Sequence, residues 1–392
     1  MAWLIPLADL DLDESEIQAV TQVLRSKWLT MGQVTQDFER RFAEHIGVKH
    51  AFAVANGTVA LHLAHAALGI GPQDEVVLPS LTFVATANAA LYTGATPVFA
   101  DITSLDNLTV SPQSIEQRIS PRTRAITVMH YGGYLCAMGE IVSIAHEHGL
   151  AVIEDAAHAP GASIGGKMAG TFGDVGCFSF FSNKNLATGE GGMVVTDRDD
   201  LADKIRVMRS HGMTTLTWDR HQGHAHSYDV VALGYNYRID EIRSALGLVQ
   251  LGKLEKNNSQ RRWLTAEYQR LLSVIPGIRV PFIDHAGLSS CHLFPVILDS
   301  QVNRQRFMDC MREQGIQTSI HYPPIHQFSY YRQRFGDQAG LLPLTEQVGL
   351  REVTLPLYPG MTARHVELVV DAVRLALDRG MAANPAPDQH KG

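Results

Sequence analysis

The sequence has little cysteine and no long hydrophobic run. Its four cysteines are widely spaced and form no C-x-x-C motif: Cys136, Cys177, Cys291 and Cys310. This spacing argues against a zinc site and a disulfide framework, and it favours a reducing cytoplasm. No run of about 18 apolar residues occurs, so we predict no membrane span. The N-terminal segment MAWLIPLADLDLDESE lacks the basic start and long apolar stretch of a signal peptide.

An excess of positive charge is also missing. The 392 residues include 33 Lys and Arg against 40 Asp and Glu, for a formal net charge of −7. Nucleic-acid binding needs a basic face, so this balance argues against it. Neither G-x-G-x-x-G nor G-x-x-x-x-G-K-[ST] occurs, and therefore neither a Rossmann dinucleotide site nor a P-loop is supported.

Short apolar segments alternate with helical patterns over the first 200 residues. The predicted strands are 52–55, 75–80, 96–101, 125–131, 151–155, 176–181 and 192–197. Such alternation predicts parallel βαβ units and a sheet covered by helices on both faces.

The pattern changes after about residue 200, where a long helical segment covers residues 239–273. A chain of this length favours two domains. We predict a large domain over residues 1–250, a smaller α+β domain over 251–380, and a disordered Pro- and Ala-rich tail over 381–392.

Three polar features lie where predicted strands end, the edge at which open parallel sheets bind ligands. Asn56-Gly57-Thr58 precedes a helix and suits either a phosphate or a plain N-cap. Asp155 either pairs with a buried cation or caps the next helix. Lys184 is either a nucleophilic amine that forms a Schiff base or a lysine that extends to solvent.

These features together match the parts of pyridoxal 5′-phosphate. The turn and the Ser179 hydroxyl suit its phosphate, Asp155 suits its protonated ring nitrogen, and Lys184 suits its aldehyde. A lysine paired with an acid at the ring nitrogen is the mark of enzymes that use this cofactor. The combination therefore favours a pyridoxal phosphate enzyme.

The chain also resembles a known family over residues 5 to about 375. It is similar to the DegT/DnrJ/EryC1/StrS sugar aminotransferases, within the fold type I (aspartate aminotransferase-like) superfamily. The motifs that carry the resemblance are KWLTMGQVTQDFE (27–39), ANGTVALHLA (55–64), DEVVLPSLTFVATANA (74–89), VIEDAAHAPGA (152–162), SFFSNKNLATGEGG (179–192), LGYNYRIDEIRSALGLVQL (233–251) and IHYPPIH (320–326). The implied fold class is α/β: a large domain with a mostly parallel seven-stranded sheet between helices, plus a smaller α+β C-terminal domain.

The resemblance implies roles for the residues around the cofactor ring. Lys184 would hold pyridoxal 5′-phosphate covalently and act as the general base. Asp155 would pair with the pyridine nitrogen, and His158 would lie near the phenolic oxygen. Phe83 occupies the aromatic position that stacks on the ring.

The resemblance also implies a phosphate site shared between two subunits. Gly57, Thr58 and Ser179 would contact the phosphate from one subunit, and Asn236 would reach it from the neighbouring one. The expected assembly is therefore a homodimer with shared active sites. His321 and Tyr322 are candidate substrate contacts, although a rigid turn at the adjacent prolines explains them equally well.

The family reaction moves an amino group from L-glutamate to a keto carbon of a nucleotide-linked sugar. KWLTMG (27–32) and NLATGEGGM (185–193) resemble the patterns of C4 enzymes. We therefore predict a dTDP-keto-6-deoxyhexose 4-aminotransferase, working in the cytoplasm in deoxysugar synthesis for antibiotics or cell-surface glycans.

The sequence is also compatible with other functions. The acceptor could be a C3 keto sugar or a cyclitol of the scyllo-inosose type. A sugar dehydratase of this family has histidine in place of the lysine, and Lys184 argues against it. A regulator on the same fold would need a DNA-binding segment and a basic face, which the sequence lacks. The histidine-rich segment HQGHAHSYD (221–229) fits either a metal site or, more simply, a mobile loop near the substrate.

Overall fold

The structure is a computed structural model that describes residues 3–215, 223 and 227–381. Its main feature is a seven-stranded sheet in the order β1-β9-β8-β5-β4-β2-β3. The strands are β1 (His50–Val54), β2 (Glu75–Pro79), β3 (Thr96–Ala100), β4 (Thr123–Met129), β5 (Ala151–Asp155), β8 (Val175–Ser179) and β9 (Gly192–Thr196). The predicted mostly parallel seven-stranded sheet is confirmed.

Strand β9 is the exception to the parallel arrangement. It pairs antiparallel with both β8 and β1. The chain returns from β8 to β9 through a loop without a crossover helix, and a parallel neighbour would need such a crossover. That returning loop contains Lys184.

Helices cover both faces of this sheet, because alternate side chains of each strand point to opposite faces. Within β9, Val194 packs into one core cluster with α3 (Gly57–Ala67), α4 (Ala85–Tyr92) and α7 (Asp199–Met208). Its neighbours Met193 and Val195 pack into another cluster with α2 (Gln33–Ile46) and α9 (Glu241–Leu272). On that second face, α6 (Met138–His148) covers the strands nearer β4, beside the short helix α5 (Pro112–Glu116).

Two helices precede the first strand of the sheet. Helix α1 (Glu14–Ser26) begins with a capping box in which the Asp13 side chain and the Glu16 side chain each accept a backbone N–H. Helix α2 is not among the predicted helices, although Phe38, Phe42 and Ile46 recur at helical spacing and are all buried.

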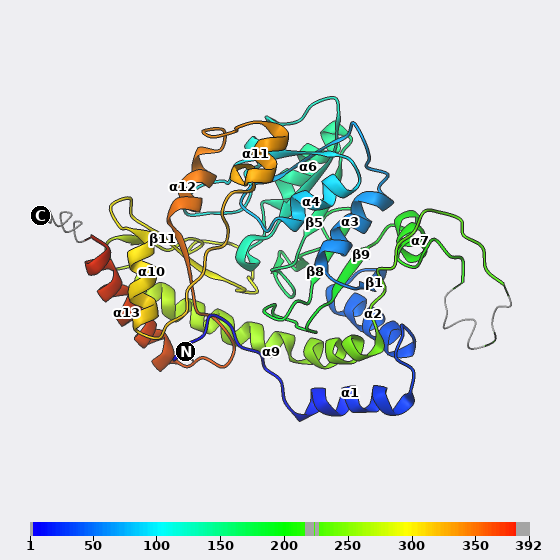
Figure 1. The fold of residues 1–392 in the computed structure, drawn as a ribbon, viewed down its shortest axis with the longest axis horizontal. Helices are drawn as coiled ribbons and strands as arrows, with labels where there is room; N and C mark the ends of the chain where they lie inside the picture. Colours follow the sequence, from blue (N-terminus) through cyan, green and yellow to red (C-terminus); the bar gives the residue numbers. More distant parts are fainter. Residues whose placement is uncertain (1–2, 216–222, 224–226, 382–392) are drawn as a thin grey trace, which may run out of the picture.

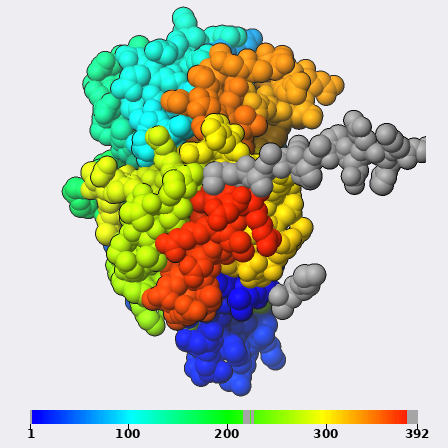
Figure 2. All heavy atoms as spheres, turned by 90° about the vertical axis from the view of Figure 1, so that its left-hand side faces the viewer, coloured from blue at the N-terminus to red at the C-terminus, as the bar shows by residue number. Residues whose placement is uncertain are grey.

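A second core surrounds a smaller antiparallel sheet of β10 (Ile278–Arg279), β11 (Phe294–Leu298) and β12 (Glu352–Leu355). Helices α10 (Arg304–Glu313) and α13 (Ala363–Met381) pack on this sheet together with the last turns of α9. Figure 2 shows α13, in red, lying beside α9 and α10. Helices α11 (Ser329–Phe335) and α12 (Pro343–Arg351), the short turns η1 (Tyr131–Gly133) and η2 (Ile325–Gln327), and the hairpin of β6 (Ser163–Ile164) and β7 (Lys167–Met168) complete the described elements.

Helix α9 connects the two cores. It runs from beside α1 and α2 to α13 (Figure 1), so the predicted domain boundary at residue 250 falls inside a continuous helix. Ile5, near the N-terminus, is fully buried in the second core and bridges to Ile316. The division into two domains stays a prediction, and the predicted tail beyond Met381 lies outside the described residues.

None of the helices in the described ranges combines the length and the apolar composition that crossing a lipid bilayer requires.

Candidate active site

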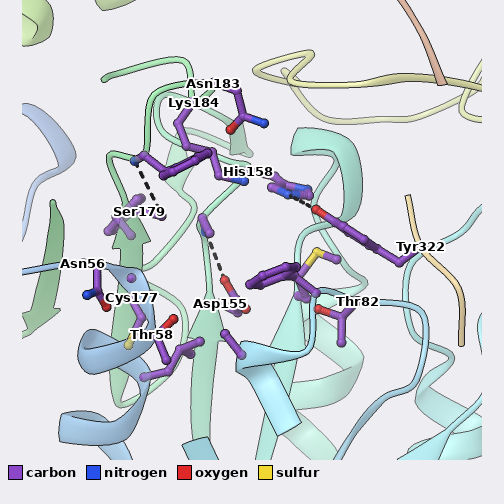
Figure 3. A pocket seen from close by; sticks show the side chains of 18 of the residues that line it. Asn56, Thr58, Thr82, Asp155, His158, Cys177, Ser179, Asn183, Lys184 and Tyr322 are labelled. Carbon is purple, nitrogen blue, oxygen red and sulfur yellow. Dashed lines mark hydrogen bonds between the residues drawn. The ribbon is translucent and has the colours of Figure 1, made fainter. Parts of the chain in front are cut away.

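A cavity of about 410 Å³ opens at the carboxyl ends of the parallel strands. Figure 3 shows Asn56, Thr58 and Ser179 on one side of it and Tyr322 on the other, with Asp155 between them. Nine of the ten candidate residues line this cavity: Gly57, Thr58, Phe83, Asp155, His158, Ser179, Lys184, His321 and Tyr322. They come from segments far apart in the sequence, and the sheet edge brings them together.

Asn236 is the candidate that does not line the cavity. It is exposed, and its backbone bridges to Ser210.

The end of the cavity near α3 is built to receive an anion. The side chain of Asn56 accepts the N–H of Val59 at 3.0 Å and caps the helix. The N–H groups of Gly57 and Thr58 lie in the first turn, before the intrahelical hydrogen bonds begin. A Cβ atom at position 57 would lie 2.8 Å from the Cβ of Ser179, so only glycine lets the helix start approach that hydroxyl so closely. Backbone donors and hydroxyls at a helix N-terminus suit a phosphate.

Asp155 ends β5 on the floor of the cavity and is 4% exposed. One carboxylate oxygen accepts a hydrogen bond from the Thr86 hydroxyl at 2.7 Å, and the other accepts the N–H of Ala157 at 3.2 Å. Burial raises the pKa of this carboxyl group, and the two hydrogen bonds and the charge of Lys184 oppose that rise. A buried carboxylate in this position is stabilised by a cationic partner.

Lys184 lies in the loop after β8, and its amine faces the same cavity. Burial lowers the pKa of Lys184 from 10.5 to about 8, although the negative charge of Asp155 opposes the change. About a tenth of this amine is therefore unprotonated at pH 7, far more than for an exposed lysine, and the unprotonated form is a nucleophile and a proton acceptor. Its Nζ atom lies 3.5 Å from Nε2 of His292.

His158 presents a defined hydrogen-bond donor to the cavity. Its Nδ1 accepts the N–H of Gly132 at 3.2 Å, so the proton of the neutral ring must be on Nε2. That Nε2 lies 2.9 Å from the hydroxyl of Tyr322. Burial and the charge of Lys184 hold the pKa of His158 well below its usual range, and the ring stays neutral. The ring of Phe83 lies 6.0 Å from that of Tyr322, at the cavity mouth.

His321 and Tyr322 line the cavity and are also tied into the fold. The backbone N–H of His321 donates to Glu352 at 2.8 Å, and its Nδ1 lies 2.8 Å from the Thr354 hydroxyl. The Tyr131 hydroxyl donates to the His321 carbonyl. Both readings of this pair, as cavity residues and as parts of a rigid turn, are therefore compatible with the structure.

Four residues at or beside the site are not predicted from the sequence: Thr86, Asn185, His292 and Glu352. Asn185 follows Lys184 directly, and this adjacency is the signal that could have found it. Thr86, His292 and Glu352 carry no such signal.

The metal interpretation of the segment 221–229 stays untested by the structure. Among the described residues, no group of three or more His, Cys, Asp or Glu side chains could hold a metal ion. His221, His224 and His226 lie outside the described residues.

The profile of the DegT/DnrJ/EryC1/StrS aminotransferase family matches residues 10–374. The chain belongs to this family. The spore coat polysaccharide biosynthesis protein SpsC of Bacillus subtilis (strain 168) is 42% identical over 368 residues, which cover 93% of this chain and 94% of that protein. DesV of S. venezuelae superposes with a TM-score of 0.89 at 34% identity, covering 97% of this chain and 100% of that one. DesI, solved in the presence of its TDP-sugar product, superposes with a TM-score of 0.86 at 32% identity, covering 97% and 94%.

These likenesses confirm the expected family and the fold type I architecture. The protein is an enzyme, a pyridoxal 5′-phosphate-dependent aminotransferase, and family members bind this cofactor through a lysine. The residues around the cavity fit the cofactor. The close approach of Gly57 to Ser179 brings backbone N–H groups and a hydroxyl together where they could receive a phosphate. The buried Asp155 could pair with a protonated ring nitrogen, and Lys184 has an amine that could hold the aldehyde.

Proposed function

We propose that the protein transfers the amino group of L-glutamate to C4 of a dTDP-linked 4-keto-6-deoxyhexose. The observation that carries the proposal is the pairing, in one cavity, of a lysine whose pKa burial lowers to about 8 and a buried carboxylate beside an anion-binding helix start. Glutamate leaves as 2-oxoglutarate, and the keto oxygen of the sugar leaves as water when the amine replaces it.

Each residue has a proposed task towards the cofactor. Lys184 holds it covalently, and Asp155 pairs with its ring nitrogen. Gly57, Thr58 and Ser179 hold its phosphate. A bound pyridoxal phosphate supplies an electron sink at the carbon that loses or gains the amine.

The remaining cavity residues orient the ring and move protons. Nε2–H of His158, which faces the Tyr322 hydroxyl, would serve as a hydrogen-bond donor to an oxygen on the cofactor ring. Phe83 covers the cavity mouth as a stacking surface. Lys184, when it is not bonded to the cofactor, would accept the proton from the carbon that loses the amine and would donate a proton to the carbon that gains it, because its pKa near 8 suits both uptake and release.

The proposed sugar class and the proposed C4 position rest on the similarity of this chain to known proteins. DesI was solved with a TDP-sugar product, SpsC is named for polysaccharide synthesis, and the NLATGEGGM segment resembles C4 enzymes. The test is a panel of 3-keto and 4-keto dTDP-sugars, UDP-keto sugars and free scyllo-inosose, with L-glutamate as donor and mass spectrometry as readout. Amination of the 4-keto dTDP-sugar supports the proposal. Amination of only a 3-keto sugar or the free cyclitol overturns the C4 assignment.

We also propose that two copies of the chain share each active site through Asn236. This residue is exposed and outside its own cavity, and the adjacent segment exposes large apolar side chains, with Val231 at 59% and Leu233 at 81%. Exposed apolar surface of this kind suits a subunit interface.

A mixing experiment tests this sharing. Lys184→Ala and Asn236→Ala variants are purified separately, then unfolded and refolded together. If Asn236 serves the partner's site, each mixed dimer has one intact site. About a quarter of wild-type activity should then return, because half of random dimers are mixed. No recovery, with dimers shown by light scattering, contradicts the shared site.

A further inference from the structure

A network of hydrogen bonds through two buried amides connects the backbone near α9 to His292 and Lys184. Nδ2 of Asn258 donates to the carbonyl of Pro160 at 2.9 Å. A carbonyl can only accept, so the amide oxygen of Asn258 must face the other way, where it accepts from Nδ2 of Asn185 at 2.8 Å. The same Nδ2 donates its second proton to the carbonyl of Ser290 at 2.7 Å. The orientation of the Asn185 amide is thereby determined twice over.

This orientation decides the protonation of His292. The Asn185 amide oxygen lies 3.0 Å from Nδ1 of His292. Since that oxygen can only accept, Nδ1 must carry the proton of the neutral ring, and Nε2 presents a lone pair. Nε2 is the atom that lies 3.5 Å from Nζ of Lys184, the outer limit of a hydrogen bond.

His292 is kept neutral by its surroundings. It is 5% exposed, and the groups around it that could titrate or carry charge are Lys184, His158, His321 and Arg261. Burial is the main reason why the pKa of His292 lies well below its usual range. The four neighbours, which are cationic when protonated, lower this pKa further. A second positive charge beside the lysine is therefore disfavoured, and the ring acts only as an acceptor towards it.

The hydrogen-bond network connects three separate segments of the chain. Asn185 is in the loop after β8, His292 precedes β11, and Asn258 is in the middle of α9. A purely structural network could end on any backbone group, but this one ends on the side-chain amine that the enzyme needs. Each buried member has its hydrogen-bond partner, which gives the network one stable arrangement.

We propose that Asn258, Asn185 and His292 are positioning residues that present a lone pair of fixed direction to Lys184. The amine then keeps one orientation, with its remaining positions facing the cavity, whenever it is not bonded to the cofactor. This inference rests on the proposed role of Lys184. In the opposite ring tautomer, an N–H would face the ammonium group and repel it.

The test compares the reactivity of Lys184 in three variants of the full chain. Each is loaded with pyridoxamine 5′-phosphate, the cofactor form that leaves the lysine free, and labelled with acetic anhydride between pH 6 and 10. His292→Asn keeps a donor to Asn185 but removes the acceptor facing Lys184. His292→Gln places an amide oxygen near the Nε2 position. His148→Asn, at the exposed end of α6, is the control.

We expect His292→Asn to label Lys184 about three-fold faster or more at pH 7, because an ammonium that loses its acceptor gives up its proton more readily. His292→Gln should return the labelling profile towards wild type, and the control should match it. Unchanged labelling in a folded His292→Asn variant overturns the inference. Neutron diffraction of the wild-type enzyme gives an independent answer if the variants do not fold. A proton on Nδ1 alone supports the inference, and a proton on Nε2 overturns it.

Failure of the inference can be told apart from failure of the proposed function. Borohydride reduction of the pyridoxal phosphate form followed by peptide mapping identifies the residue that holds the cofactor. If that residue is not Lys184, the proposed function is wrong and this inference is wrong with it. If it is Lys184 and His292→Asn leaves the labelling unchanged, only the positioning role is wrong.

Discussion

Glu352, the first residue of β12, gives the most direct test of the electrostatics beside the cavity. Its side chain is fully buried. One carboxyl oxygen accepts the backbone N–H of His321 at 2.8 Å, and the other lies 2.5 Å from the hydroxyl of Thr354. Burial raises the pKa of Glu352 from 4.5 to about 8, although those two hydrogen bonds and the charge of Arg304 oppose the rise.

This pKa makes stability depend on pH in a defined direction. Between pH 4.5 and 8 the folded protein keeps a proton on Glu352 that the unfolded chain releases. The unfolded state then binds fewer protons, so the contribution of Glu352 to the free energy of unfolding falls as pH rises through this window and levels off above it. At about 1.4 kcal/mol per pH unit, the upper limit of the loss is about 5 kcal/mol.

The change Glu352→Gln should remove this loss. The amide reproduces the protonated carboxyl group: its oxygen accepts from His321 N–H, and its N–H₂ group donates to the Thr354 oxygen, which leaves the Thr354 hydroxyl proton to donate to Nδ1 of His321. We expect the variant to match wild type near pH 5 and to exceed it at pH 8.5 by about 2–5 kcal/mol. Urea denaturation at several pH values, followed by circular dichroism, measures the difference, with the exposed Glu116→Gln as control. A difference that does not change with pH, or a variant that is less stable at pH 8.5, refutes the reasoning.

The other predictions concern the cofactor. Lys184→Ala should abolish covalent attachment of the cofactor, which is read from the visible absorbance, and it should also abolish transamination. Retained turnover would contradict the proposed role of Lys184. Asp155→Asn should lower kcat by roughly 100-fold, because the partner of the ring nitrogen loses its charge, and Thr86→Val, which removes only the 2.7 Å hydrogen bond to Asp155, should have a smaller effect. Equal effects in steady-state assays would count against the charge argument. Ser179→Ala should raise the dissociation constant for pyridoxal phosphate by about ten-fold through the loss of one phosphate contact, measured by fluorescence titration. Gly57→Ala should raise it further, since the new Cβ would lie 2.8 Å from the Cβ of Ser179, and an unaltered affinity would exclude a phosphate at this turn.

The cavity residues could be found from the sequence because of where strands end. Asp155 and Ser179 are the last residues of β5 and β8, and Gly57 begins the helix after β1. Parallel strands end at one edge, so locating short apolar runs was enough to bring these residues together. The outer positions Phe83, His321 and Tyr322 came from family resemblance, because no local pattern indicates them.

The second group of residues could not be found in this way. His292 lies 107 residues from Asn185 and 108 from Lys184, and their contact depends on how the segment before β11 packs against the loop after β8. Glu352 reads in sequence as an ordinary charged residue after a helix. Its burial follows only from the pairing of β12 with β11.

The sequence by itself determined the sheet, most of the helices that cover it but not α2, the acid at the end of β5, the lysine in the loop after β8, and the family. These depend on periodic burial and on short motifs, which are local properties of the chain. The tertiary structure decided which atoms titrate and which carry protons. The tautomers of His158 and His292 and the raised pKa of Glu352 depend on acceptors and donors contributed by distant segments, and desolvation exists only once the chain has folded around them.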